Sequence, residues 1–178
     1  MTTNKAWKIS VFSAEDIASQ IGQLGALLFA CVADGASIGF VLPFTAEESE
    51  AFWQGKVLPA VRQGTRMLLV AESCGRIVGT VQLDHDTPAN QPHRAEVRKL
   101  LVHPEFRRRG IAQALMAELE RHASEMGRRL ITLDTRSGDK AEPLYAALGY
   151  KTVGVIPGYC RDTIEDRLDA TTIMYKAL

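Results

Sequence analysis

Three arginines and a glycine, Arg107, Arg108, Arg109 and Gly110, stand directly before a stretch with helical periodicity. The first turn of a helix carries about half a positive charge and four unpaired amide donors, so it disfavours cations and favours anions. Gly110 stands where a better helix former would be worth up to about 1 kcal/mol, which suggests a backbone surface kept bare for a close neighbour. The pattern indicates a pyrophosphate site with guanidinium groups beside it. A solvated basic turn in which Gly110 eases a bend is the alternative that the same spacing allows.

The elements on either side of this turn would hold it in place. Residues 94–102 (RAEVRKLLV) are predicted to form a strand, and a helix is predicted from Ile111 to its C-terminal cap Gly127. A second strand over residues 130–134 (LITLD) ends at Asp134. We expect Asp134 to lie at the carboxyl edge of the sheet, where α/β folds place their ligands.

The rest of the chain supplies the remaining elements of a mixed sheet. Alternation, helical spacing and turn residues predict strands over residues 6–12, 66–72, 76–84, 150–156 and 170–177, and helices over residues 13–33, 45–63 and 138–149. Their order predicts an α/β fold with a mixed sheet of about seven strands and about four helices, paired in parallel where a helix intervenes. Because no linker or repeat interrupts the 178 residues, we expect one domain over residues 1–178.

The composition of the chain argues against nucleic acid, membranes and metals as partners. Lys plus Arg and Asp plus Glu number 21 each, so no overall charge attracts nucleic acid or an anionic membrane. The longest apolar run, residues 24–33, is about half the length that spans a bilayer. We expect a cytoplasmic protein, in which the three widely spaced cysteines stay reduced. The four histidines show no paired ligand spacing, so no metal site is expected.

Two segments carry a resemblance to a known family. Residues 107–112 (RRRGIA), preceded by LLVHPEFR, fit the (Gln/Arg)-x-x-Gly-x-(Gly/Ala) signature of the GNAT family of N-acetyltransferases. Residues 141–150 (AEPLYAALGY) are similar to that family's Ala-x-x-x-Tyr-x-x-x-Gly-(Phe/Tyr) element. The resemblance implies a single-domain GNAT-like fold whose splayed central strands hold acyl-CoA, and an acetyl-CoA-dependent N-acetyltransferase. A homodimer, which is common in that family, is a further expectation.

The resemblance also implies which residues hold the coenzyme. The side chains of Arg109 and Gln113 would contact it, and the backbone of Leu101 and Val102 would pair with its pantetheine arm. The backbone amides that would bind the pyrophosphate belong to Arg107, Arg108, Arg109, Gly110, Ile111 and Ala112. Many members have Asn where this chain has Gly138, so any coenzyme contact made by that Asn has no counterpart here.

Three side chains are predicted to carry the acid–base chemistry: Glu96, Asp134 and Tyr145. An aliphatic amine has a pKa near 10, so it must lose a proton before it can accept an acetyl group. Glu96 and Asp134 would hold the amine and take that proton, and burial of an isolated Glu96 would raise its pKa. Tyr145 falls on the tyrosine with which the family often protonates the leaving sulfur. The alternatives are a salt bridge of Glu96 with Arg94 or Arg98, a turn cap for Asp134, and core packing for Tyr145.

A closer resemblance suggests the acceptor. The segments similar to the bacterial tabtoxin-resistance acetyltransferases, which act on a small dipeptide-like toxin, are residues 35–40, 95–102, 133–135 and 157–160. They imply a small amino-acid-like or dipeptide-like amine, such as a toxin or antibiotic, with Ser37, Phe40 and Tyr159 as candidate contacts. The loop 86–93 and the segment 157–163 are candidate walls of the acceptor site, or else ordinary surface loops.

Other functions fit parts of the pattern. Residues 35–39 (GASIG) match the Gly-x-Ser-x-Gly elbow of α/β-hydrolases, which would make Ser37 an esterase nucleophile. An elbow follows a strand and opens a helix, whereas this one follows an apolar helix, which argues against the esterase. A non-catalytic acyl-CoA sensor, and an acetyltransferase of protein N-termini or lysines, are further alternatives on the same fold.

Overall fold

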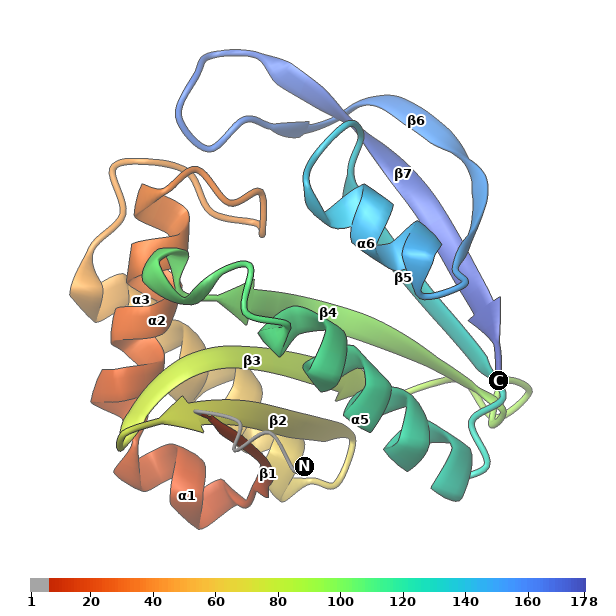
Figure 1. Ribbon diagram of the computed structural model, residues 1–178, viewed down its shortest axis with the longest axis horizontal. Helices are drawn as coiled ribbons and strands as arrows, with labels where there is room; N and C mark the ends of the chain where they lie inside the picture. The colour runs from red at the N-terminus through yellow and green to blue at the C-terminus, as the bar shows by residue number, and fades with distance from the viewer. Residues whose placement is uncertain (1–6) are drawn as a thin grey trace.

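A seven-stranded sheet forms the centre of the structure, a computed structural model that describes residues 7–178 (Figure 1). The strand order is β1-β2-β3-β4-β5-β7-β6, and within the described chain only β4 and β5 run parallel to each other. The strands are β1 (Lys8–Phe12), β2 (Arg66–Ser73), β3 (Arg76–Asp84), β4 (Arg94–Val102), β5 (Leu130–Arg136), β6 (Lys151–Arg161) and β7 (Leu168–Ala177). The predicted mixed sheet of seven strands is confirmed. Residue 6, the first of the predicted strand 6–12, lies outside the described residues.

Helices cover both faces of the sheet. One apolar core joins it to α5 and α6, and a second joins its other face to α1–α4. The helices are α1 (Ala14–Ser19), α2 (Ile21–Ala33), α3 (Ala46–Phe52), α4 (Leu58–Arg62), α5 (Ile111–Glu125) and α6 (Ala141–Ala147), with a π-helical turn (Trp53–Val57) between α3 and α4 and a 3₁₀ turn (Pro104–Phe106) before α5. Leu24 and Leu28 of α2, and Leu115 and Leu119 of α5, are fully buried, as their helical spacing predicts. Among the described residues, no helix combines the length and the apolar character needed to cross a membrane.

Two of the predicted helices are divided. The helix predicted over residues 13–33 begins with the expected Ser13–Asp16 capping box but breaks at Gln20, between α1 and α2. The helix predicted over residues 45–63 contains the π-helical turn just before Pro59. Proline has no amide hydrogen, and its ring crowds the carbonyl four residues earlier, so a wider turn at this point relieves the clash.

A bulge in β4 changes the face that its side chains occupy. The register between β3 and β4 shifts by one residue, and Lys99 in the bulge has a φ of 50°. Before the bulge, Ala95 and Val97 belong to the core under α5, whereas after it Leu101 belongs to the core under α2. The faces are exchanged because side chains alternate along a strand and one residue has been inserted.

The parallel strands β4 and β5 pair over their first residues and then separate. The pairing joins residues 94–96 of β4 to residues 130–132 of β5, although β4 continues to Val102 and β5 to Arg136. Figure 1 shows the two halves of the sheet, β1–β4 and β5–β7, diverging from this junction. The predicted splay of the central strands is therefore present, and it leaves the facing edges of β4 and β5 unpaired with each other.

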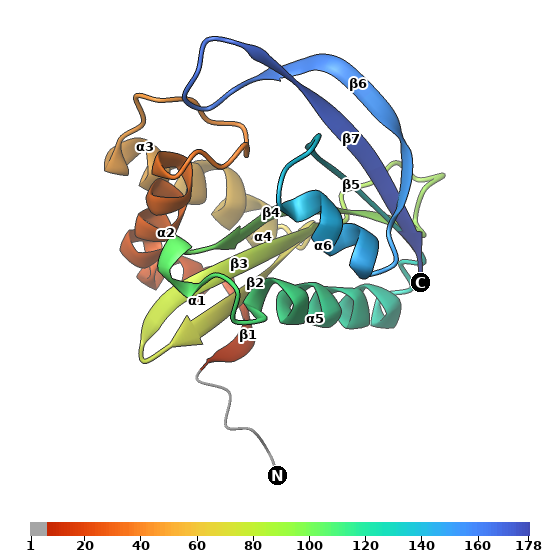
Figure 2. The ribbon, with the colours of Figure 1, turned by 45° about the horizontal axis from the view of Figure 1, so that its top comes forward.

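The hairpin of β6 and β7 reaches back to the loop that follows α2 (Figure 2). Thr163, at the tip of the hairpin, donates from Oγ1 to Ala36 O at 2.9 Å and accepts from Leu42 N at 2.9 Å. β6 extends to Arg161, beyond the predicted end at residue 156, with a register shift around Pro157. Proline is tolerated there because it falls at an irregularity of an edge strand.

Candidate active site

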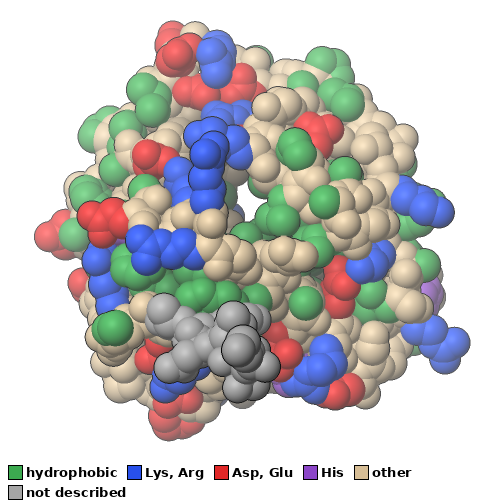
Figure 3. Space-filling view, viewed as in Figure 1, with side chains coloured by type: hydrophobic (Ala, Val, Ile, Leu, Met, Phe, Trp, Pro, Cys, Tyr) green, Lys and Arg blue, Asp and Glu red, His purple; other side chains and the backbone are tan. Residues whose placement is uncertain are grey.

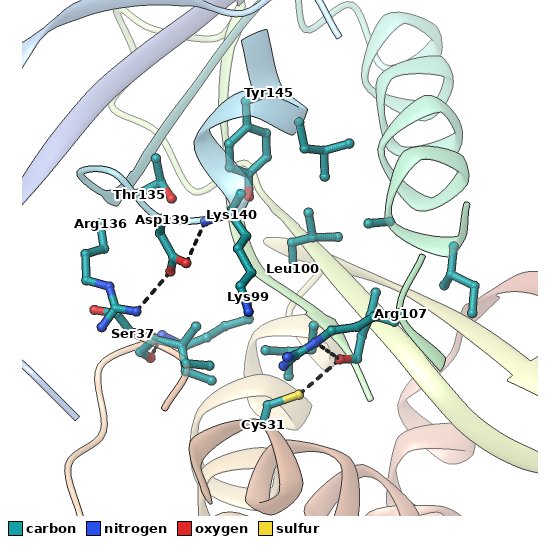
Figure 4. Close-up of a pocket in the computed structure, with 18 of the residues that line it drawn as sticks. Cys31, Ser37, Lys99, Leu100, Arg107, Thr135, Arg136, Asp139, Lys140 and Tyr145 are labelled. Atoms are coloured by element: carbon teal, nitrogen blue, oxygen red, sulfur yellow. Dashed lines mark hydrogen bonds and ion pairs between the residues drawn. The ribbon is translucent and has the colours of Figure 1, made fainter. Parts of the chain in front are cut away.

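The separation of β4 from β5 opens a cavity of about 710 Å³, called here the larger cavity. Its walls come from the second half of β4, the turn before α5, the end of β5, α6 and the loop after α2. Figure 3 shows an opening near the middle of this face, with Lys and Arg side chains gathered beside it. Figure 4 shows the side chains that point into the cavity.

A second cavity of about 400 Å³, the smaller cavity, adjoins the larger one. It lies between β4, the end of β5, β6 and the loop after α2. The residues that line both cavities are Ser37, Ile38, Val97, Lys99, Asp134, Thr135 and Arg136. The two cavities therefore adjoin each other along a shared wall.

The start of α5 presents bare backbone to the larger cavity. Gly110 is the N-cap residue, has no side-chain cap, and has a φ of 77°, in the left-handed region that favours glycine. The helix's first backbone hydrogen bond runs from Ala114 N to Gly110 O at 3.0 Å, so the amides of residues 111–113 have no acceptor within the helix. Residues 110–113 line the cavity, and a Cβ added to Gly110 would meet nothing within 4 Å. This arrangement suits an anion.

Arg107 and Arg108 also line the larger cavity. Arg107 is held by an ion pair with Asp34 at the end of α2, and its Nε donates to Val102 O at 3.4 Å. Arg108 has a φ of 61°, and within residues 7–178 it has no ion-pair partner. Of these two predicted residues, Arg108 is therefore the one whose charge is available to an anion.

Arg109 does not line the larger cavity. It donates from Nη2 to Glu105 O at 3.0 Å, and its guanidinium group lies over the ring of Phe106, 4.8 Å from the ring centroid. This conformation keeps the guanidinium group engaged outside the cavity, and contact of the side chain with the coenzyme stays a prediction. Gln113, the other predicted side-chain contact, does line the cavity.

Leu101 and Val102 line the larger cavity on the β4 side. The carbonyl of Val102 already accepts from Cys31 Sγ at 3.6 Å and from Arg107 Nε at 3.4 Å. Burial raises the pKa of the Cys31 thiol to about 11, so this cysteine is an inert neutral group. Pairing of β4 with a pantetheine arm stays a prediction, and the oxygen of Val102 is partly engaged.

Tyr145 projects from α6 into the larger cavity (Figure 4). Its side chain is 6% exposed and packs edge-to-face against Tyr150, with ring centroids 5.8 Å apart. Burial, and then the charges of Asp134 and Asp139, raise the pKa of its phenol above the ordinary value. Tyr145 is therefore a protonated donor at neutral pH that lines a cavity, and it also packs in the core as the alternative proposed.

Asp134 stands in the shared wall of the two cavities. It is exposed, and its Oδ2 accepts at 3.2 Å from the buried Thr171 hydroxyl, which is shared with Thr135 O at 3.0 Å. No cation among the described residues forms an ion pair with it within 4.0 Å. The carboxylate is thus oriented by a hydroxyl while its charge stays available to a ligand.

Glu96 lines the smaller cavity, but it is not the isolated buried carboxylate that its strand position suggested. Its side chain is 30% exposed and pairs with Arg98 Nη2 at 3.3 Å, while Arg98 Nε also pairs with Asp84 at 3.0 Å. The expectation of an isolated, buried carboxylate is therefore wrong, because Arg98, two residues on, lies on the same face of β4. The salt bridge with Arg98 is the alternative that the structure contains.

The three candidate acceptor contacts, Ser37, Phe40 and Tyr159, all line the smaller cavity. The segment 157–163 supplies part of its wall through Tyr159, Cys160 and Arg161. The loop 86–93 lines neither cavity, because it joins β3 to β4 at the opposite end of β4. There Arg128 Nη1 donates to Thr87 Oγ1 at 3.1 Å. That loop is not a wall of the site.

Ser37 does not have the surroundings of an esterase nucleophile. It lies in the loop after α2, and its polar side-chain contact is Cys160 Sγ at 3.8 Å. The match to the α/β-hydrolase elbow therefore does not indicate an esterase, because the segment does not connect a strand to a helix, as argued from the sequence. Within residues 7–178, no group of three or more His, Cys, Asp or Glu side chains is arranged to hold a metal ion.

Lys99 is the site residue that the sequence reasoning missed. It lines both cavities, and its ammonium group donates to Ile38 O beside the rings of Phe40 and Phe52. Burial, and then Arg98, lower its pKa, while Asp134 and Glu96 act in the opposite direction. The available signal was the position of Lys99 in the strand RAEVRKLLV. Strict alternation would place it on the same face as the apolar residues Ala95, Val97 and Leu101.

Comparison with known proteins gives the site a context. The profile of the acetyltransferase (GNAT) family matches residues 39–150, which include the turn before α5 and Tyr145. An acetyltransferase of Pectobacterium atrosepticum is 40% identical over 102 residues, which are 57% of this chain and 68% of that protein.

Solved structures share the fold at low sequence identity. The ribosomal-protein-alanine N-acetyltransferase of Brucella melitensis has a TM-score of 0.75 at 21% identity, covering 96% of this chain and 99% of that chain. An acetyltransferase of Salmonella typhimurium, solved with its cofactor acetyl-CoA, has a TM-score of 0.74 at 18% identity, covering 97% of this chain and 94% of that chain.

Proposed function

The chain belongs to the GNAT family of acetyltransferases, and from this premise we propose that it moves an acetyl group from acetyl-CoA to the primary amine of a small amino-acid-like or dipeptide-like molecule. One observation carries the proposal. A cavity with a bare helix start and a cavity with two carboxylates share a wall that contains Asp134. A donor and an acceptor bound on either side of that wall would bring their reacting groups together.

The larger cavity fits coenzyme A. The amides of residues 111–113 face it without a helical acceptor, and Gly110 leaves the approach open, which suits the pyrophosphate. Arg108 and Lys140 line the same cavity and have no ion-pair partner within the described residues, so they can add charge contacts to phosphate. Residues of β4 that line the gap between β4 and β5, including Leu101, would flank the pantetheine arm.

The chain's own groups would handle two protons. Bound acetyl-CoA supplies an activated acetyl thioester. Asp134 and Glu96 would hold the ammonium form of the acceptor and take a proton from it, which frees the nitrogen lone pair to form the new amide bond. As the carbon–sulfur bond breaks, the hydroxyl of Tyr145 would donate a proton to the departing sulfur. Its raised pKa favours the return of a proton to the phenol after turnover.

The geometry favours a small acceptor over a protein chain. The smaller cavity has a volume of about 400 Å³, within the range of small-molecule sites. The loop after α2 and the β6–β7 hairpin, which both contribute to its lining, are tied to each other by the hydrogen bonds of Thr163. The resemblance to tabtoxin-resistance acetyltransferases supports a toxin or antibiotic as the acceptor, and that role and a cytoplasmic location stay predictions.

Release of free thiol from acetyl-CoA tests the function. The protein is incubated with acetyl-CoA and a panel of amino acids, dipeptides, simple amines and lysine-containing peptides. Turnover with the small amines and none with the peptides is the expected result. Saturable coenzyme binding without turnover on any acceptor would favour the non-catalytic sensor, and turnover on peptides alone would favour a protein acetyltransferase.

A further inference from the structure

Lys99 places a cation where the two cavities meet. It lies in the β4 bulge, so its side chain leaves the alternation of the strand and reaches toward the loop after α2 (Figure 4). The side chain is largely buried, yet it lines both cavities. A lysine in this position is both sheltered from bulk water and open to a bound molecule.

The other cations of the smaller cavity are already paired with carboxylates. Arg98, Arg136 and Arg161 line this cavity together with Lys99. Their ion-pair partners include Glu96, Asp139 and Asp166, respectively. Lys99 has no carboxylate within 4.0 Å among the described residues. It is therefore the cation of this cavity whose charge is not neutralised by the chain.

The contacts of Lys99 leave donor capacity unused. An ammonium group has three N–H donors, and here the hydrogen bond is to Ile38 O. The rings of Phe40 and Phe52 lie with their centroids 5.7 and 5.8 Å from Nζ, which adds cation–π attraction but accepts no ordinary hydrogen bond. Burial of a charge with such incomplete pairing is costly unless a ligand completes it.

Asp134 is the counterpart of opposite sign. The acids of the smaller cavity are Glu96 and Asp134, and Glu96 is paired with Arg98. Asp134 accepts a hydrogen bond from Thr171 and, within residues 7–178, has no cation within 4.0 Å. The shared wall thus offers one unpaired anion and one unpaired cation, which do not pair with each other.

A ligand that satisfies both groups carries an amine and a carboxylate. We propose that Lys99 is a specificity-determining residue that binds the carboxylate of the acceptor while Asp134 holds its amine, so that the site selects amino acids or peptides with a free carboxylate over amines that lack one. This inference rests on the proposed function, which supplies the acceptor amine. It adds the carboxylate as the second group by which the site recognises the acceptor. Charge complementarity at both ends fixes which nitrogen faces the larger cavity.

A purely structural role for Lys99 makes a different prediction. Its hydrogen bond to Ile38 O ties β4 to the loop after α2, so removal of the ammonium group could loosen that wall for every acceptor alike. Recognition of a carboxylate instead penalises acceptors that carry one. Matched acceptors that differ only at the carboxylate separate the two roles.

The test measures binding of L-alanine, glycylglycine and their C-terminal amides, in the presence of coenzyme A, by titration calorimetry. Wild-type protein is compared with Lys99→Met, which keeps an unbranched apolar side chain without the ammonium group, and with Lys99→Arg, which keeps the charge. We expect the wild type to bind each acid more tightly than its amide. We expect Lys99→Met to lower that acid/amide ratio by about tenfold or more, the size of a lost charge-assisted hydrogen bond, and Lys99→Arg to retain most of it. Because the same acid and amide are used with each protein, comparing this ratio between the wild type and a variant cancels the different basicities of the two amines.

The outcomes separate this inference from the proposed function. An unchanged acid/amide ratio in Lys99→Met, an equal loss for acids and amides, or no binding of any acid by the wild type would overturn the role of Lys99. Binding of the acids that depends on Lys99, with no thiol released from acetyl-CoA, would support Lys99 and contradict the acetyltransferase. Thermal unfolding and coenzyme binding of each variant show that it is folded.

Discussion

The larger and smaller cavities meet at Asp134 yet are built in different ways. The anion site of the larger cavity comes from one short segment, residues 107–113, and offers mainly backbone amides at a helix start. The smaller cavity takes side chains from β4, β5, β6, β7 and the loop after α2. Backbone recognition depends on a local conformation that few sequences adopt, whereas side-chain recognition can change with single substitutions. We therefore expect single substitutions to change recognition in the smaller cavity more readily than at the start of α5.

The largest expected effect belongs to the wall that the two cavities share. Asp134→Asn keeps the shape of the side chain but removes its charge, so it should lower kcat by about 10³-fold, within the range for a lost acid–base group. Affinity for coenzyme A should stay unchanged because the turn before α5 is untouched. Steady-state kinetics and coenzyme titration measure the two quantities, and a variant with wild-type kcat would remove Asp134 from the chemistry.

Tyr145→Phe should lower kcat by about 10²-fold, because it removes the hydroxyl that we propose as the proton donor without changing the ring. Tyr150→Phe is the matched control, since that ring packs against Tyr145 but does not line either cavity. Thiol-release kinetics of the two variants compare them directly. Equal losses in both would mean that the pair of rings serves packing and that the hydroxyl of Tyr145 transfers no proton.

The backbone character of the anion site is tested at Gly110. Gly110→Ala places a Cβ on a residue with a φ of 77°, a strain of about 1–2 kcal/mol, so the turn should shift and coenzyme affinity should fall about tenfold. Gly127→Ala is the control, because Gly127 has a φ of 73° at the other end of α5 and lines neither cavity. Titration calorimetry with coenzyme A should show loss in the first variant only. Equal affinities would mean that the turn is not the coenzyme site.

The smallest effect distinguishes two neighbouring arginines. Arg108→Gln should weaken coenzyme binding about threefold, as expected for one partly exposed charge contact. Arg109→Gln should weaken it less, because its guanidinium group is occupied by Glu105 O and the ring of Phe106. The difference should shrink at high salt, where exposed charges are screened. The opposite order of effects would mean that Arg109 swings into the cavity when coenzyme binds.

Local patterns were enough to predict much of the fold and the start of α5. The strands at residues 76–84 and 94–102 have the predicted bounds, and α5 begins just after Gly110 as its glycine and periodicity indicate. These features depend on neighbours in the sequence, such as turn residues and alternation. The splay of β4 and β5 was implied by the family resemblance and not by local patterns.

The details of the smaller cavity depend on contacts between distant segments. The pairing of Arg98 with Asp84 requires the register of β3 against β4, whereas its pairing with Glu96 on the same strand is the alternative that the sequence already offered. The bulge that takes the Lys99 side chain out of the alternation of β4 depends on the same register. Neither the pairing with Asp84 nor the bulge is specified by local periodicity, because a one-residue insertion leaves the composition of a strand unchanged.

The most direct test of the account is a titration of the protein with acetyl-CoA, followed by NMR of its backbone amides. The account predicts saturable binding with the largest shifts at the amides of residues 108–113, and smaller shifts at Phe40 and Tyr159 in the smaller cavity. Saturation that leaves residues 108–113 unshifted, or no binding at all, would contradict the claim that the start of α5 holds the coenzyme.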